Sequence, residues 1–346
     1  MTTENPPHSN RGVVIKKEEI NPLLSMVDYI RVSFKSHDID YVLENVLHLK
    51  KEYMQELQTG FYGYVGTYQL DNIKVFYSVE GDNRGILIEM SGKGCRQFES
   101  FLNWRKKTWF DFFNDCLEHK GTFTRFDLAI DDYKTYFKIP KLLEKVKNGE
   151  AISKFRKSDY NGSYSIEDGS TGGTTIYFGS KKSEVYLCFY EKNYEQAEKY
   201  NKPLEDFPEW NRYELRLKND RAQVAIREMI RTKDLLNVAK QIINNYLRFV
   251  EKRDTNRNTW KTSEFWERFI GDVGKLKLYM EPKREFYEKS RNWLKNSCSP
   301  TMKMILEADE ALGNNDLSDM IMNAELSDKQ EKMLNVFLAE LGDMVC

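Results

Sequence analysis

Residues 174–192, TTIYFGSKKSEVYLCFYEK, decide the fold of this chain. Apolar and polar residues alternate on both sides of the polar segment GSKKSE, a pattern that predicts a β-hairpin. The segments TFTRFDLAID at 122–131 and NRYELRLK at 211–218 show the same alternation and are predicted strands. Side chains of a strand point alternately to its two faces, so each segment has an apolar face and a polar face.

The alternation sorts the side chains of these strands into two sets. The set expected in the core consists of Phe126, Leu128, Ile130, Val185, Leu187, Phe189, Tyr213, Leu215 and Leu217. The set expected on the opposite face consists of Arg125, Asp127, Asp131, Tyr186, Cys188, Tyr190, Lys192, Arg212, Glu214, Arg216 and Lys218. If the strands are neighbours, carboxylates, a phenol and several cations share one surface of a sheet.

The rest of residues 26–220 indicates two similar halves. The first half contains predicted strands and helices at 27–34, 63–70, 72–79, 85–90 and 91–120, with a helical stretch that ends near Gln58. The second half adds a helix at 139–147 and a short helix before residue 211 to the strands above. We therefore predict an α+β fold in which two similar sheet-plus-helix halves join their sheets into one domain over residues 26–220.

Three further segments flank this domain. Residues 1–25 are polar and contain prolines, which predicts a flexible arm. Residues 221–300 are predicted to be helical, with one long helix at 220–252 and a linker, NSCSPT, at 296–301. Residues 301–346 are predicted to form an acidic helical tail.

The net charge of −1 hides an uneven distribution along the chain. Residues 305–346 contain ten acidic residues and two lysines, a net charge of −8, which leaves +7 on residues 1–304. A basic body is compatible with a polyanionic ligand, although ordinary solvated charge explains the same distribution.

Composition excludes several classes of protein. No apolar run approaches the roughly 18 to 20 residues that cross a bilayer, and the N-terminus lacks the apolar core of a signal peptide. We therefore expect a cytoplasmic protein with no membrane partner. The five cysteines and four histidines are scattered, without the spacing of a disulfide framework or a zinc site. A catalytic metal would depend on carboxylates, which favours Mg²⁺ or Mn²⁺.

The polar face suits phosphodiester transfer better than other reactions. A tyrosine hydroxyl, with a pKa of about 10, attacks poorly until a cation or a base helps to remove its proton. Lys192, Arg125 or a metal ion could do this for Tyr190. A divalent ion held by Asp127 and Glu214 would neutralise charge on the phosphate. Glycoside hydrolysis is less compatible, because it needs a carboxylic acid with a raised pKa and basic surroundings lower carboxyl pKa values. For any single strand, the alternative is a solvated sheet face with cross-strand ion pairs.

A family resemblance rests on these motifs together. TRFDLAIDD, YFGSKKSEVYLCFYEKNYE and NRYELRLK resemble, in order and spacing, the replication initiators of rolling-circle plasmids of the staphylococcal trans-acting type and the related relaxases of integrative conjugative elements. VDYIRVSF at 27–34 and IEMSGKGCRQFE at 88–99 resemble the NicK-like relaxases of the conjugative branch. The resemblance covers about residues 26–220, and its most specific part is the hairpin from YFG to YEK.

The resemblance implies roles for single residues. Tyr190 stands at the position of the nicking tyrosine, Asp127 and Glu214 match acidic positions associated with metal, and Asp131 is a second acidic match. The other matches and the residues expected to bind DNA are Arg125, Lys192, Glu195, Arg212, Arg216, Lys218, Lys181 and Lys182. Cys188 and Lys181 replace arginines, and Arg216 replaces a second glutamate of some members, which leaves the number of metal ligands open.

The implied activity is site- and strand-specific DNA nicking and rejoining through a 5′-phosphotyrosine, at an origin that is single-stranded at the nick and duplex nearby. A conjugative-element relaxase is the first interpretation; a plasmid or phage replication initiator and a non-catalytic DNA-binding protein are the alternatives. The helical region at 221–300 would grip duplex DNA, so a fragment ending near Asp220 is expected to cleave single strands. A helicase or coupling protein and a second copy of the chain are candidate partners.

Overall fold

The computed structural model describes residues 23–253, 255–278, 291, 293–327 and 330–331. The chain divides into two compact units, Met1–Tyr279 and Met280–Cys346, which are described separately. Most of the expected arm, residues 1–22, lies outside the described residues, and residues 23–25 begin the first strand.

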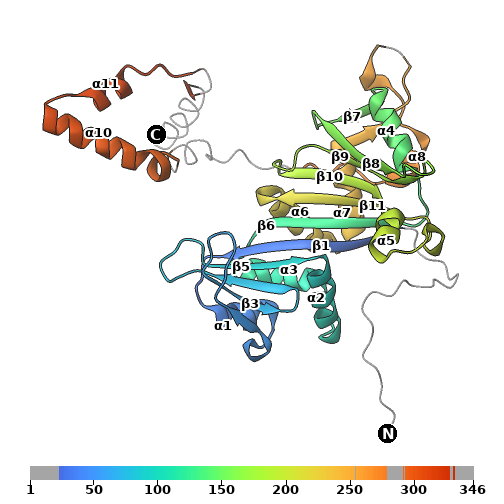
Figure 1. Cartoon of the computed structure of the whole chain (residues 1–346), viewed down its shortest axis with the longest axis horizontal. Helices are drawn as coiled ribbons and strands as arrows, with labels where there is room; N and C mark the ends of the chain where they lie inside the picture. The colour runs from blue at the N-terminus through green and yellow to red at the C-terminus, as the bar shows by residue number, and fades with distance from the viewer. Residues whose placement is uncertain (1–22, 254, 279–290, 292, 328–329, 332–346) are drawn as a thin grey trace, which may run out of the picture. The chain divides into compact units, whose positions relative to one another are not determined.

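The first unit is built on a ten-stranded antiparallel sheet (Figure 1). Its strands are β1 (Leu23–Phe34), β2 (Gln55–Leu57), β3 (Gly66–Leu70), β4 (Ile73–Tyr77), β5 (Ile86–Ser91), β6 (Thr122–Asp132), β8 (Ser158–Tyr164), β9 (Thr171–Phe178), β10 (Val185–Glu191) and β11 (Asn211–Lys218). Two short strands, β7 (Ala151–Ser153) and β12 (Leu247–Phe249), pair separately. The predicted hairpin at 174–192 is the pair β9 and β10.

Two halves with the same strand order form this sheet. Outward from the centre, the first half runs β1-β5-β4-β3-β2 and the second runs β6-β11-β10-β9-β8. In each half the first strand pairs with the last, and the others follow in reverse chain order. The antiparallel pairing of β1 with β6 joins the halves. The α+β prediction of two similar halves with joined sheets is therefore confirmed.

Helices cover one face of the sheet. They include α2 (Gly92–Trp104), α3 (Trp109–Glu118), α6 (Asn219–Thr232) and α7 (Leu235–Tyr246), which share one apolar core with the inward side chains of the strands. Every residue that the alternation assigned to the core of the three strands lies in it. Among the described residues, no helix has the length and apolar composition needed to cross a membrane.

Capping residues divide two predicted helices. The helix expected at 91–120 is two helices, because Thr108 and Asp111 form a reciprocal cap that begins α3. The helix expected at 220–252 stops at Lys233, which has φ +55°, and Asp234 then caps α7 by accepting from the backbone of Asn237. The apolar periodicity continues across both breaks, so it predicted one helix where side-chain caps begin a second.

Three other predicted segments also differ from the structure. The helical stretch before Gln58 consists of α1 (Ile39–Val42), short turns and the strand β2, because His48 takes a left-handed conformation and ends the first turn. The strand β8, SDYNGSY, lies at the exposed sheet edge and lacks the apolar alternation that identifies a strand. The expected linker at 296–301 is helical, since Pro300 occupies the first turn of α10 (Ser299–Leu312).

The core of the first unit extends well beyond residue 220. Side chains of α6, α7 and α8 (Glu264–Ile270), including Ile226, Ile242, Trp266 and Phe269, are fully buried in the same core as the strands. The helices expected to form a separate region after residue 220 are therefore part of the first unit up to Tyr279. In the second unit, buried Asp309 of α10 accepts from the backbone at the start of α11 (Asp316–Met322).

A fragment that ends at Asp220 is consequently expected to be unfolded. Each fully buried aliphatic or aromatic side chain contributes about 1.5–3 kcal/mol, so losing those of α6, α7 and α8 exceeds the roughly 5–15 kcal/mol that stabilises a domain. Circular dichroism melting should show no cooperative transition for this fragment, whereas a fragment ending at Tyr279 should melt like the full chain. A folded 1–220 fragment that still cleaves single strands would contradict this expectation and restore a boundary at 220.

Candidate active site

Strand pairing brings the predicted polar residues onto one surface. β11 lies between β6 and β10, with Cys188 opposite Glu214 on one side and Asp127 opposite Arg216 on the other. Because the inward residues of the same strands fill the core, their polar neighbours share the face that the core helices do not cover. The grouping inferred from sequence alternation is therefore present in the fold.

Tyr190 lies at the centre of a short hydrogen-bond chain. Its hydroxyl donates to Oε1 of Glu214 at 2.8 Å, and Nζ of Lys192 donates to the same hydroxyl at 3.3 Å. Lys192 begins α5 (Lys192–Tyr200), where both oxygens of Glu195 hold its ammonium group. Tyr190 thus has a carboxylate that can take its proton and a cation that can stabilise the phenolate.

The environment keeps Tyr190 protonated at rest. Burial raises the pKa of the Tyr190 hydroxyl well above its ordinary value of about 10, and the negative charge of Glu214 raises it further. The positive charge of Arg212 acts in the opposite direction but is outweighed. Attack by this hydroxyl therefore requires proton transfer during the reaction, and Glu214 is in place to accept the proton.

Arginines connect Glu214 to Asp127. Arg216 donates to Oε2 of Glu214 at 2.7 Å and lies 3.9 Å from Asp127, while Arg125 holds Asp127 with two hydrogen bonds of 3.0 and 2.6 Å. Both carboxylates are almost fully buried, with Asp127 3% and Glu214 7% exposed. Burial raises the pKa of Asp127, against the lowering effect of Arg125. The two carboxylates therefore lie close together in a site that already contains positive charge.

Asp131 belongs to a different cluster. Arg212 donates to both of its oxygens at 2.6 and 2.7 Å, and Asp131 is only 1% exposed. Arg212 also lies 3.8 Å from Asp28 of β1, a partly buried carboxyl whose pKa is raised by burial and by the charge of Glu214. Sequence reasoning missed Asp28 because a β-bulge between Val27 and Tyr29 interrupts the alternation.

A hollow of about 340 Å³ opens beside Tyr190. Residues of β8, β9, β10, α5 and β11 line it, including Gly173, Thr175, Cys188, Glu195, Glu214 and Arg216. Burial raises the pKa of the Cys188 thiol to about 12, so this residue is a neutral wall and not a phosphate ligand. The hollow therefore leaves space next to both Tyr190 and Arg216.

The other predicted DNA-binding lysines lie elsewhere. Lys181 and Lys182 are exposed in the turn between β9 and β10, and Nζ of Lys218 donates to the carbonyl of Lys181. Val185 and Tyr190 are separated by five residues of strand, about 17 Å. These lysines therefore lie at the far end of β10 from Tyr190.

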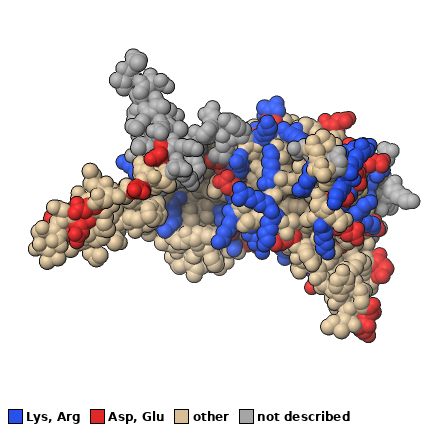
Figure 2. Space-filling view, turned by 90° about the horizontal axis from the view of Figure 1, so that it is seen from above, with Lys and Arg blue, Asp and Glu red and all other residues tan. Residues whose placement is uncertain are grey.

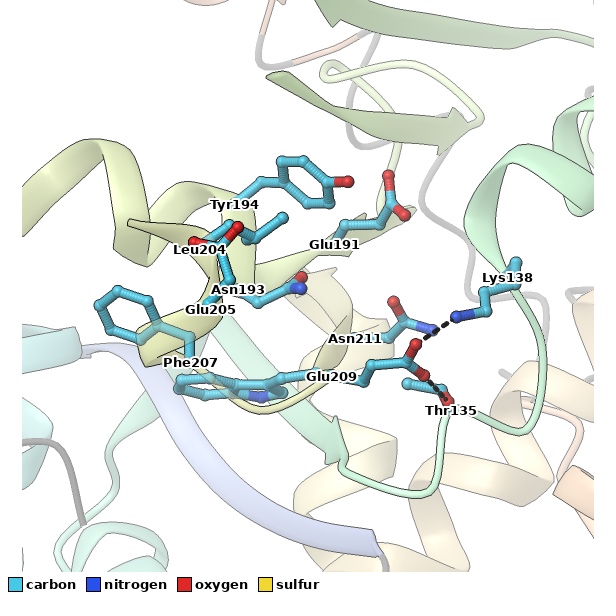
Figure 3. Close-up of a pocket in the computed structure, with 11 residues that line it drawn as sticks. Thr135, Lys138, Glu191, Asn193, Tyr194, Leu204, Glu205, Phe207, Glu209 and Asn211 are labelled. Atoms are coloured by element: carbon cyan, nitrogen blue, oxygen red, sulfur yellow. Dashed lines mark hydrogen bonds and ion pairs between the residues drawn. The ribbon is translucent and has the colours of Figure 1, made fainter. Parts of the chain in front are cut away.

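Tyr194 borders a second hollow, of about 270 Å³, next to the first (Figure 3). Figure 3 shows it with Glu191, Asn193 and Phe207, and with Glu209 paired to Lys138. Tyr194 follows Tyr190 by four residues and lies in α5, after β10 has ended. Tyr190 is the tyrosine that donates to Glu214, whereas Tyr194 lies near Glu191 in the neighbouring hollow.

Comparisons with known proteins identify the family. Residues 121–321 match the model described as "Replication initiation factor", and residues 25–115 match "Rolling Circle replication initiation protein N-terminal domain". The chain is 69% identical, over 99% of both chains, to a Bacillus subtilis (strain 168) protein named "Putative DNA relaxase NicK". The chain belongs to the replication initiation factor family. The match at 25–115 contains the strands of the first half of the sheet, and the match at 121–321 contains those of the second half together with helices that follow it.

A solved structure agrees with the assignment to the replication initiation factor family. A rolling circle replication initiator protein from Geobacillus stearothermophilus has a TM-score of 0.64 and 31% identity, and the match covers 75% of this chain and 100% of that one. Helices after residue 220 lie within the first family match. The family relationship therefore extends past the 26–220 segment on which the sequence resemblance was based.

The carboxylates of this surface could bind a divalent cation. Among the residues that the structure describes, no group of three or more His, Cys, Asp or Glu side chains is placed to hold a metal ion. Mg²⁺ and Mn²⁺ commonly use one or two carboxylates together with substrate phosphate and water. Asp127 and Glu214 both lie beside Arg216 and could supply such a pair, whereas Asp131 lies with Arg212 in the other cluster.

Asp131→Ala should therefore act on stability. Removing one partner of a buried ion pair leaves the other charge uncompensated, so we expect a loss of about 3–5 kcal/mol in the free energy of unfolding, measured in urea. The control is Asp159→Ala, which removes an exposed pair with Lys157 and should cost less than about 1 kcal/mol. Equal stability of the two variants, together with a lost metal response for Asp131→Ala, would instead make Asp131 a ligand.

Proposed function

We propose that this protein cuts and rejoins one strand of DNA at an origin, with Tyr190 as the nucleophile. The observation that carries the proposal is the hydrogen bond from Tyr190 to Glu214, beside a hollow that contains Arg216. The family and the names of the relatives, a relaxase and a rolling circle initiator, support DNA as substrate. Lys and Arg side chains gathered on one face of the molecule also suit a polyanion (Figure 2).

The reaction is a phosphodiester exchange. The Tyr190 oxygen attacks the phosphorus while its proton passes to Oε1 of Glu214, and the bond to the 3′ oxygen breaks. The 3′ oxygen leaves as a hydroxyl with a proton from solvent, and the 5′ phosphate stays on Tyr190. Lys192 and Arg216 stabilise the growing negative charge. Rejoining is the reverse, with the 3′ hydroxyl attacking the phosphotyrosine and the proton returning to Tyr190.

Asp127 and Glu214 would hold a divalent metal, Mg²⁺ or Mn²⁺. Such an ion neutralises negative charge on the non-bridging oxygens of a phosphate. Glu214 has two separate oxygens for its two tasks, since Oε1 accepts from Tyr190 and Oε2 accepts from Arg216, which also lies 3.9 Å from Asp127. Arg125 keeps Asp127 oriented toward this position.

A conjugative relaxase is favoured over a plasmid or phage initiator, because the 69% identical relative carries the relaxase name over the full length. Both would use the same chemistry. A non-catalytic DNA-binding protein would bind DNA but form no covalent product. Duplex binding by residues 221–300, a helicase or coupling protein as partner of the acidic tail, and a homodimer remain predictions.

Tyr190→Phe should abolish covalent adducts while leaving folding and DNA binding nearly unchanged, since it removes only the attacking oxygen. Supercoiled DNA that carries the protein's own element is incubated with each variant and analysed on denaturing gels with and without protease. Tyr186→Phe, on the same face of the same strand, is the control and should form adducts normally. Normal nicking by the Tyr190→Phe protein would end this assignment.

Asp127→Asn and Glu214→Gln should each lower the nicking rate by about 100- to 1000-fold, corresponding to several kcal/mol of lost stabilisation. Both variants should also need more Mg²⁺ or Mn²⁺ for half-maximal activity, which a metal titration of initial rates measures. Asp159→Asn, an exposed carboxylate change, should behave like the wild type. Full wild-type activity in excess chelator would refute the metal proposal.

A further inference from the structure

An aromatic loop covers the open face of the first half of the sheet. Residues 58–65, QTGFYGYV, connect β2 to β3, and the rings of Phe61, Tyr62 and Tyr64 lie 6.0–6.3 Å from the ring of Phe76. Phe76 is buried but lies opposite Leu87, outside the core that Ile73 and Val75 share with the helices. The loop therefore lies on the sheet face that carries Tyr190 in the second half.

The loop holds two large aromatic side chains in solvent. Phe61 is 62% and Tyr62 is 56% exposed. Tyr62 has φ +58°, which a tyrosine rarely adopts, and a Cβ at Gly60 would come within 2.0 Å of the carbonyl oxygen of Tyr64. The rings cover Phe76 on one side, but a strained backbone that leaves more than half of Phe61 and Tyr62 in solvent indicates that their open sides meet a ligand.

Cations accompany these rings. The guanidinium of Arg31 lies 4.2 Å from the centre of the Tyr62 ring and donates to its hydroxyl at 2.6 Å, and Nζ of Lys74 lies 5.9 Å from the centre of the Phe61 ring. Exposed aromatic rings beside cations are the combination that binds single-stranded nucleic acid, because rings stack on bases while cations bind phosphates. Duplex DNA has its bases stacked inside and offers no base face to these rings.

A continuous series of contacts connects the loop to the candidate active site. Arg31 donates to the hydroxyl of Tyr29 at 2.7 Å, and Arg125 lies 3.9 Å from the centre of the Tyr29 ring. Arg125 then holds Asp127, which lies beside Arg216. From β4 to β10 the sheet order contains five strand spacings, about 24 Å, which is the span that a single strand would have to cross.

We propose that Phe61 and Tyr62 are a stacking platform for bases of the single strand that flanks the nick. Lys74 binds its phosphates, while Arg31, which is held by Glu89, fixes the Tyr62 ring. The proposal rests on the proposed function and adds a binding site on the half of the sheet that lacks Tyr190. The strand leaves Tyr190, crosses the central pair β6 and β1, and reaches the platform. The platform sets affinity for the single strand and takes no part in the chemical step.

The test compares a Phe61→Ala/Tyr62→Ala double variant with a Trp104→Ala control. Trp104 is 86% exposed, but it ends α2 on the helix-covered side of the sheet. The probe is labelled oligo-dT of about 20 nucleotides, longer than the estimated track, measured by fluorescence anisotropy. We expect the double variant to bind roughly 5- to 100-fold more weakly, from the stacking energy per base, while the control and the affinity of every variant for duplex stay unchanged.

Cleavage kinetics and crosslinking give independent readings. On a single strand that the wild type cleaves, the double variant should show a raised KM with kcat unchanged. Oligo-dT that contains 5-iodouracil should crosslink in the wild type to the peptide containing Phe61 and Tyr62, a result that does not depend on how the variant folds. Equal oligo-dT affinity of folded double variant and wild type, or no crosslink to this peptide, overturns the proposal and leaves the loop to a protein partner.

The outcome is separable from the proposed function. If the wild type forms no adduct through Tyr190, the nicking assignment fails, whatever the loop binds. If adducts form normally but the double variant keeps full single-strand affinity, only the platform is rejected.

Discussion

The register of β11 against β6 and β10 is the constraint on which the site depends. Because side chains alternate along a strand, a slip of one residue in β11 would turn Glu214 and Arg216 into the core and bring Leu215 to the face of Tyr190. The apolar face prevents this slip, since Tyr213, Leu215 and Leu217 are fully buried against the helices. Core packing therefore fixes on which face the hydroxyl, the carboxylates and the arginines lie, and the hydrogen bonds among them then set their geometry.

Alternation explains what could be predicted from the sequence. The strands around Asp127, Tyr190 and Glu214 have regular alternation, so their faces and their common surface followed directly, as did the joining of two similar half-sheets. Asp28 could not be assigned, because the bulge beside it shifts the register. The strand β8 is exposed and polar on both faces. It therefore lacks the apolar alternation from which a strand is predicted. The helix breaks at Thr108 and Asp234 depend on side-chain caps. Apolar periodicity does not reveal such caps, so each break was predicted as continuous helix.

The contacts between side chains were harder to predict from the sequence than the strands and their faces. The sequence placed Asp131 and Arg212 on the polar face but could not show that they bind each other, whereas Glu214 hydrogen-bonds Tyr190. In the absence of DNA, Arg125 and Arg216 neutralise Asp127 and Glu214, which offsets part of the cost of burying two carboxylates. In the proposed reaction, a phosphate would compete with these carboxylates for the arginines and would thereby free carboxylate oxygens for the proposed divalent cation.

The joined sheet also explains how chemistry and strand binding can be separate yet aligned. One half alone has five strands, about 19 Å across, which is too narrow for a site at β10 and an aromatic platform above β4. Pairing of β1 with β6 doubles this surface and makes it continuous, with no mobile linker between the halves. The halves share a strand order but differ in their exposed side chains. A single strand crossing the central pair would therefore meet rings in one half and the nucleophile in the other at a distance set by strand spacing alone.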